Sequence, residues 1–147
     1  MSVQEQIDKY IADQDLSKRE TLQGLHRIIL KLSPNCRLWF IDGRNSENKI
    51  VSNESIGYGS TTLRYVNGRS REFYRIGLSA NTAGISIYVI GLENKKYLSE
   101  TYGKTIGKAK ITSYCVTFRH IKDINVVILE EMIANHMDAR EAEPGPT

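Results

Sequence analysis

Runs rich in Tyr, Thr, Val, Phe and Ile over residues 56–90, separated by polar turn residues, predict three consecutive antiparallel strands. The first two strands meet at Asn67-Gly68, a dipeptide typical of a two-residue type I′ turn because both residues tolerate positive φ angles. This turn would place Arg64 directly opposite Arg71. A second turn, over residues 81–84, would return the chain to form the third strand.

Helical spacing of apolar residues is found on both sides of these strands. A capping box over residues 2–5 predicts a first helix that ends near Ala12, and a second capping box over residues 17–20 predicts a helix that ends before Pro34. A last helix should begin after a cap at Asp123 or Asn125. Its expected apolar residues are Val127, Leu129, Ile133 and Met137.

Two more strands, over residues 36–41 and 112–119, and a short helix over residues 94–102 complete the prediction. Since strands and helices do not alternate, the expected class is α+β: N-terminal helices, an antiparallel sheet of about five strands, and a C-terminal helix packed on one sheet face. We expect a single domain over residues 1–138 and a disordered tail over residues 139–147.

The composition is that of an ordinary globular protein, with 147 residues, 40% of them hydrophobic and 25% charged. The sequence has no apolar run near the ~20 residues that span a bilayer, and its first residues do not resemble a signal peptide. Two distant cysteines, Cys36 and Cys115, indicate reduced thiols. We therefore expect a cytoplasmic protein without a membrane partner, of unknown oligomeric state.

Charge is distributed unevenly along the chain. Residues 64–122 carry eleven basic and three acidic residues, a net charge of +8, whereas residues 123–147 carry one basic and six acidic residues, a net charge of −5. The two segments could neutralise each other in the fold. Alternatively, the basic segment presents a positive surface to an anionic partner.

The predicted register gathers arginines on one sheet face, where their forked donors suit phosphate groups and Tyr58 offers a stacking surface. The opposite face, with Leu63, Tyr65, Tyr74, Ile76 and Leu78, would take the helices. A solvated outer face is the alternative reading of the arginines. The residues predicted to bind a small anionic or phosphate-bearing ligand are Tyr58, Arg64, Arg69, Arg71, Arg75 and Lys108.

Sequence motifs for catalysis are incomplete. Gly57-Tyr58-Gly59 lacks the last glycine of a dinucleotide fingerprint, Gly103-Lys104-Thr105 lacks the first glycine of a P-loop, and the histidines and cysteines show no zinc spacing. No nucleophile elbow or known nucleic-acid-binding module is visible. We therefore favour a binding domain without a cofactor, and nucleic acid is not an expected partner. An enzyme of unknown chemistry stays open as an alternative, because catalytic triads assemble from residues that are distant in sequence.

Several short motifs follow one another in a fixed order over about residues 7–133. They are Ile56-Gly57-Tyr58-Gly59, Tyr65, Gly68-Arg69, Gly77-Leu78-Ser79, Ile87-Tyr88, Gly107-Lys108, Cys115 and Asp123-Ile124. This series resembles the bacterial YdhG-like family, a domain of unknown function.

The resemblance implies a small cytoplasmic α+β domain, and some relatives are described as frataxin-like iron chaperones. Iron binding by acidic helix residues is therefore the alternative function. The candidate iron ligands are Glu5, Asp8, Asp13, Asp15, Glu130, Glu131 and Asp138.

Overall fold

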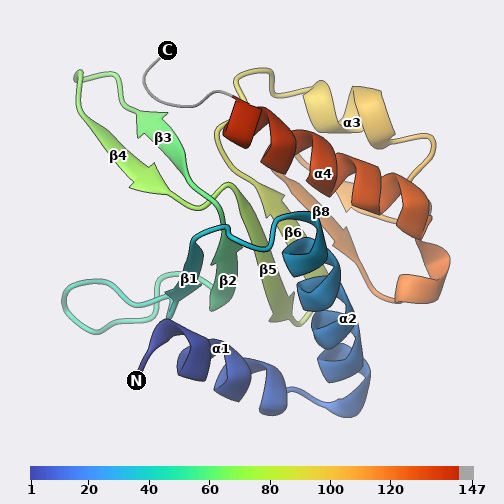
Figure 1. Cartoon of the computed structure of the whole chain (residues 1–147), viewed down its shortest axis with the longest axis horizontal. Coiled ribbons are helices and arrows are strands. Elements are labelled where there is room, and N and C mark those ends of the chain that lie inside the picture. The colour runs from blue at the N-terminus through green and yellow to red at the C-terminus, as the bar shows by residue number, and fades with distance from the viewer. Residues whose placement is uncertain (143–147) are drawn as a thin grey trace.

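A computed structural model describes the backbone of residues 1–142 and the side chains of residues 1–137 (Figure 1). Helices lie at both ends of the chain, and strands form most of its middle. In chain order the elements are α1 (Val3–Ala12), α2 (Leu16–Leu32), β1 (Leu38–Ile41), β2 (Ser55–Tyr58), β3 (Thr61–Arg64), β4 (Ser70–Phe73), β5 (Ile76–Asn81), β6 (Gly84–Val89), α3 (Tyr97–Tyr102), β7 (Lys110–Ile111), β8 (Cys115–Phe118), the short helix η1 (Ile121–Asp123) and α4 (Val126–Ala142).

The predicted α+β class is confirmed. Six antiparallel strands form the main sheet in the order β1-β2-β5-β6-β8-β7, and β3 and β4 form a separate two-stranded sheet. Helices α2 and α4 lie across one face of the main sheet, as Figure 1 shows. Within the described part of the chain, no helix is long and apolar enough to cross a lipid bilayer.

The helix boundaries follow local capping chemistry. Ser2 and Glu5 form the predicted capping box at the start of α1. At α2 the cap is Asp15, whose side chain accepts a hydrogen bond from the backbone N–H of Lys18, so the predicted capping box beginning at Ser17 is wrong. Helix α4 spans Val126–Ala142 and so includes the first residues of the predicted tail, and the rest of that tail, residues 143–147, lies outside the described part of the chain.

The loop between β3 and β4 has three residues rather than the predicted two. The backbone N–H of Tyr65 donates to the carbonyl of Arg69 at 2.8 Å, and that of Gly68 donates to the carbonyl of Tyr65 at 3.0 Å. Gly68 has a φ of +85°, which glycine adopts at little cost. These features define a type I turn followed by a glycine bulge, a common three-residue hairpin connection.

The longer loop shifts the strand register by one residue. Leu63 lies opposite Arg71, and Arg64 lies opposite Ser70. The predicted pairing of Arg64 with Arg71 is therefore wrong. Because successive side chains of a strand point to opposite faces, a slip of one residue moves every side chain of the strand to the other face.

Burial of apolar side chains explains why this register forms. Ile56 pairs with Leu78 and Tyr58 pairs with Ile76, and all four side chains are fully buried in the core beneath the helices. The predicted register would have placed glycines opposite Leu78 and Ile76 and turned Tyr58 outward. The observed register therefore buries more apolar area on the face that the helices cover.

On the face of the main sheet away from the helices, two glycines at the centre lie beneath an aromatic ring. Gly57 and Gly77 are paired across β2 and β5, and the ring of Tyr74 occupies the space above both. A Cβ atom added to Gly77 would lie 2.5 Å from Cε1 of Tyr74. Tyr74 was expected on the helix-covered face, so this placement is a correction. Burial raises the pKa of its phenol to about 12.

Candidate functional site

The strands β3 and β4 and their loop, residues 61–73, form an arm that we call the arginine ribbon. It extends away from the main sheet (Figure 1) and carries the exposed side chains of Arg64, Arg69 and Arg71. Arg64 and Arg71 are not cross-strand partners, and they project from opposite faces of the ribbon. The prediction of one face that carries all the arginines is therefore wrong.

Tyr58 is not available as a stacking surface. Its side chain is 0% exposed, and its hydroxyl oxygen lies 2.6 Å from Nδ1 of His26 in helix α2. Burial raises the pKa of Tyr58 well above its ordinary value, so the phenol stays neutral. Tyr58 connects the sheet to α2 and cannot contact a ligand at the surface.

Arg75 lies at the base of the ribbon and is partly buried. Its Nη1 donates a hydrogen bond of 2.7 Å to the carbonyl oxygen of Ile90. Its backbone N–H donates to the carbonyl of Tyr58 at 3.1 Å, which continues the pairing between the ribbon and the main sheet. The structure therefore separates Arg75 from the exposed arginines and gives it a role in anchoring the ribbon.

Arginines and aromatic rings alternate at the base of the ribbon. The guanidinium carbon of Arg37 lies 3.9 Å from the ring centroid of Trp39, and that of Arg71 lies 4.8 Å from the ring centroid of Phe73. The rings of Trp39 and Phe73 meet edge to face at 5.9 Å. Sequence reasoning missed Arg37. The signal was present, because an arginine two residues before an aromatic residue shares its face on a strand.

Lys108 lies far from the ribbon along the sheet. It precedes β7, the strand at the opposite edge of the main sheet from β1, whereas the ribbon continues from β2 and β5. Lys108 instead lines a cavity of about 510 Å³, which we call the basic pocket. The basic pocket is lined by Ala83, Lys108, Ala109, Lys110, Thr117, Phe118, Arg119, His120 and Asp123.

Local strand pairing assembles the basic pocket. Lys110 pairs with Thr117, which brings the start of β7 beside the end of β8. The backbone N–H of Lys108 donates to the carbonyl of Asp123 at 3.0 Å, which ties this strand edge to η1. Sequence reasoning found Lys108 but missed Lys110, Arg119 and His120. An available signal was the occurrence of basic residues near both ends of the predicted strand over residues 112–119.

The cations of the pocket and the ribbon are largely unneutralised. Among the described side chains, the ion pairs are Lys9–Asp13 at 2.7 Å and Arg37–Glu72 at 3.6 Å. Neither involves the basic pocket, and neither involves α4. Neutralisation of the basic segment by the acidic C-terminal segment was one of the two readings of the sequence. No ion pair supports it in the part of α4 whose side chains are described, although Asp123 of that segment lines the basic pocket.

The acidic residues considered for iron do not gather in the described structure. Among residues 1–137, no group of three or more His, Cys, Asp or Glu side chains is arranged to hold a metal ion. Glu5 caps α1, and Asp13 pairs with Lys9. Asp138 lies outside the described side chains.

One buried histidine, His136, and one half-buried histidine, His26, predict how stability depends on pH. Burial lowers the pKa of His26 and of His136, whose Nδ1 lies 2.6 Å from the carbonyl oxygen of Met132. The unfolded chain therefore binds protons more readily than the folded protein just below about pH 6.5. We expect the free energy of unfolding to be highest above that pH and to fall as the pH decreases through it.

Urea unfolding at about pH 7.5 and about pH 5.5, on either side of the ordinary histidine pKa, measures this effect. The His136→Gln variant should show a smaller difference between the two conditions than the unmodified protein. Equal free energies of unfolding at both pH values would contradict the prediction.

The chain is thus an α+β domain with two cationic features. One is the arginine ribbon, and the other is the basic pocket at the β7 edge of the main sheet. No protein-family model matches the chain, and no curated protein or solved structure matches it significantly. The resemblance to the YdhG-like family therefore stays a prediction.

Proposed function

We propose that the protein binds a small phosphate-bearing metabolite in the basic pocket. The observation that carries this proposal is the convergence of Lys108, Lys110, Arg119 and His120 around one cavity of about 510 Å³. This volume is within the range of roughly 300–1,000 Å³ for small-molecule sites. The sequence predicted anion binding mainly at the arginines of the ribbon. Of the residues predicted to bind the ligand, Lys108 is the one that lines the basic pocket.

Charge indicates the class of ligand. Two lysines and one arginine with one aspartate, Asp123, give the pocket lining a net charge of +2 when His120 is neutral. A phosphate monoester carries about −1.5 to −2 charges near neutral pH and accepts several hydrogen bonds. Arg119 can bind such a group through two parallel N–H donors. Asp123 is an acceptor for an N–H or O–H group elsewhere on the ligand.

A thermal-shift screen of sugar phosphates and nucleoside monophosphates tests the proposal. We expect at least one compound to raise the melting temperature of the protein, and the shift should weaken as salt increases. The Lys110→Gln/Arg119→Gln variant should bind that compound at least about tenfold more weakly, because each charge-assisted hydrogen bond contributes about 1.5–3 kcal/mol.

The matched control is Arg64→Gln/Arg71→Gln, which removes the same charge from the ribbon. It should retain the affinity of the unmodified protein. A screen in which no phosphate compound shifts the melting temperature would exclude the proposal, and so would equal loss of binding in both variants. No observation favours the iron-binding alternative, because the candidate carboxylates within the described side chains are not clustered.

A further inference from the structure

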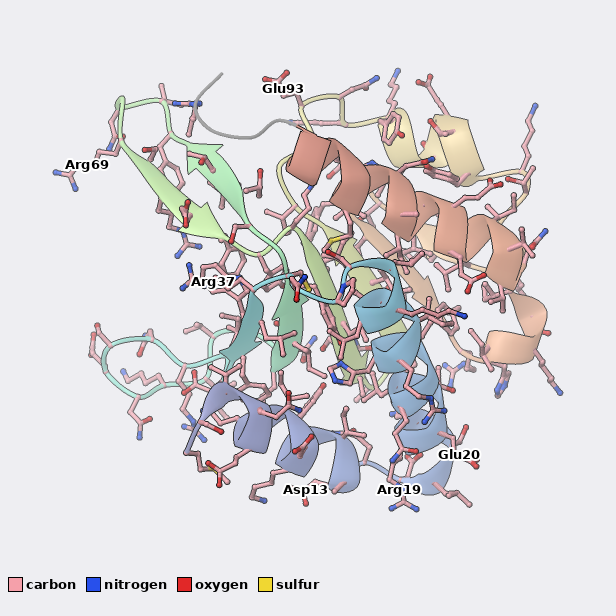
Figure 2. All side chains as sticks on the ribbon, in the orientation of Figure 1. Asp13, Arg19, Glu20, Arg37, Arg69 and Glu93 are labelled. Carbon is pink, nitrogen blue, oxygen red and sulfur yellow. The ribbon has the colours of Figure 1, made fainter. Side chains whose placement is uncertain are left out.

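The arginine ribbon is a two-stranded hairpin that extends from the body of the protein (Figure 1). Its strands pair with each other and with no other described strand. Each strand has four residues, about 13 Å at ~3.3 Å per residue. Val66 is fully exposed at the tip, and Figure 2 shows Arg69 at the outer end with its side chain directed away from the body. Nothing in the described structure covers either face of the strands near the tip.

Positive charge surrounds the ribbon rather than occupying one side. Arg64 projects from one face and Arg71 from the other, with Arg69 beside the loop. The one acidic residue of the ribbon is Glu72, which lies 3.6 Å from Arg37. Both of these side chains are 57% exposed, so their pairing is weak. The ion pair of Glu72 is thus with Arg37, and none of the three ribbon arginines forms an ion pair with a described side chain.

The aromatic rings at the base hold two guanidinium groups in place. Arg37 stacks on Trp39, and Arg71 stacks on Phe73. A stacked guanidinium keeps its N–H donors in a fixed plane, so it loses less side-chain freedom when it binds a phosphate. Figure 2 places Arg37 nearer the base of the ribbon than Arg69. Guanidinium N–H donors are thus distributed from the base of the arginine ribbon to its tip.

From this arrangement we propose a function separate from the basic pocket: the arginine ribbon binds double-stranded DNA by entering its major groove. This groove is about 12 Å wide and admits a two-stranded β-ribbon. Arginines on opposite faces of the ribbon then reach the phosphates that border the two sides of the groove. Binding through phosphates gives affinity with little dependence on base sequence.

The same geometry disfavours other anionic partners. A small phosphate compound cannot contact arginines on both faces of one ribbon. A flat anionic membrane reaches the tip but not the stacked guanidinium groups at the base. Double-stranded RNA has a major groove too narrow for this arm. Pairing of the ribbon with that of a second copy would bring like charges together.

Fluorescence anisotropy with a short, labelled, mixed-sequence DNA duplex tests the proposal at low salt. The ribbon variant Arg64→Gln/Arg69→Gln/Arg71→Gln should lose affinity by about tenfold or more, and its slope of log affinity against log salt should decrease by about 2–3. The single variants Arg64→Gln and Arg71→Gln should each weaken binding, because the groove contacts both faces. Circular dichroism checks that the variants remain folded.

The matched control removes three exposed cations elsewhere, at Arg27, Lys31 and Lys49. It should retain the salt slope of the unmodified protein. Equal losses in the control and the ribbon variant would overturn the proposal, as would a duplex affinity that none of these substitutions alters. Ribbon-dependent binding to phosphatidylcholine–phosphatidylserine vesicles without DNA binding, or a ribbon-dependent dimer in sedimentation velocity without DNA binding, would also overturn it.

Discussion

Replacing Leu129 by alanine should lower the free energy of unfolding by about 2–5 kcal/mol, whereas replacing Val127 by alanine should change it by less than about 0.5 kcal/mol. Leu129 is 0% exposed in the core, and Val127 is 64% exposed. Truncation of Leu129 removes apolar contacts and leaves a cavity beneath α4, while truncation of Val127 leaves the core unchanged. Equilibrium urea unfolding followed by circular dichroism measures both differences.

The substitutions at Leu129 and Val127 distinguish the observed structure from the sequence prediction, which assigned both side chains to the apolar face of the last helix. Residues two apart on a helix are separated by about 200° around its axis, so Val127 and Leu129 cannot point in the same direction. Comparable destabilisation by the two substitutions would contradict the observed orientation of α4. A loss near the upper value would be a large part of the roughly 5–15 kcal/mol that stabilises a typical domain.

Replacing Gly77 by alanine should destabilise the protein by about 1–3 kcal/mol, and the same substitution at Gly57 should have a similar effect. Each new methyl group would collide with Tyr74, which is almost fully buried and cannot move into solvent. Without this ring, alanine in place of a strand glycine would be neutral or slightly stabilising. Urea unfolding of each variant measures the change.

Combining each glycine substitution with Tyr74→Ala distinguishes the contact of Tyr74 with Gly77 from its contact with Gly57. At Gly77 the nearest atoms belong to the outer ring of Tyr74, with Cε1 at 2.5 Å and Cζ at 2.8 Å, and all of them are removed by Tyr74→Ala. At Gly57 the Cβ of Tyr74 itself lies 2.6 Å away, and alanine retains this atom. In the Tyr74→Ala background, Gly77→Ala should therefore become nearly neutral while Gly57→Ala remains destabilising. Equal rescue of both would contradict the observed position of Tyr74.

The features of the fold that depend on local sequence were predicted well. The capping box of α1, the end of α2 before Pro34 and the reversal at residues 81–84 all appear as expected. Each depends on residues close together in the chain. Errors arose where the local sequence fits two solutions, as with the Asp15 and Ser17 caps of α2 and the two-residue and three-residue loops at Asn67-Gly68.

The candidate sites were predicted less well, because each depends on strand register or on distant pairing. A one-residue shift was enough to bury Tyr58 and to place Arg64 and Arg71 on opposite faces. Lys108 was found, but its pocket also requires Arg119 and His120 beyond β8. Their approach follows from antiparallel pairing of β7 with β8, which no short motif specifies.

The sequence by itself determined the α+β class, the positions of most helices and strands, and an excess of positive charge in the middle of the chain. These follow from apolar periodicity, capping residues and composition, which are local properties. Only the tertiary structure decided which cations act together. Burial of Ile56, Tyr58, Ile76 and Leu78 under the helices selected the register of the sheet. That register produced the two-faced arginine ribbon, whereas pairing of β7 with β8 produced the basic pocket at the other edge of the sheet.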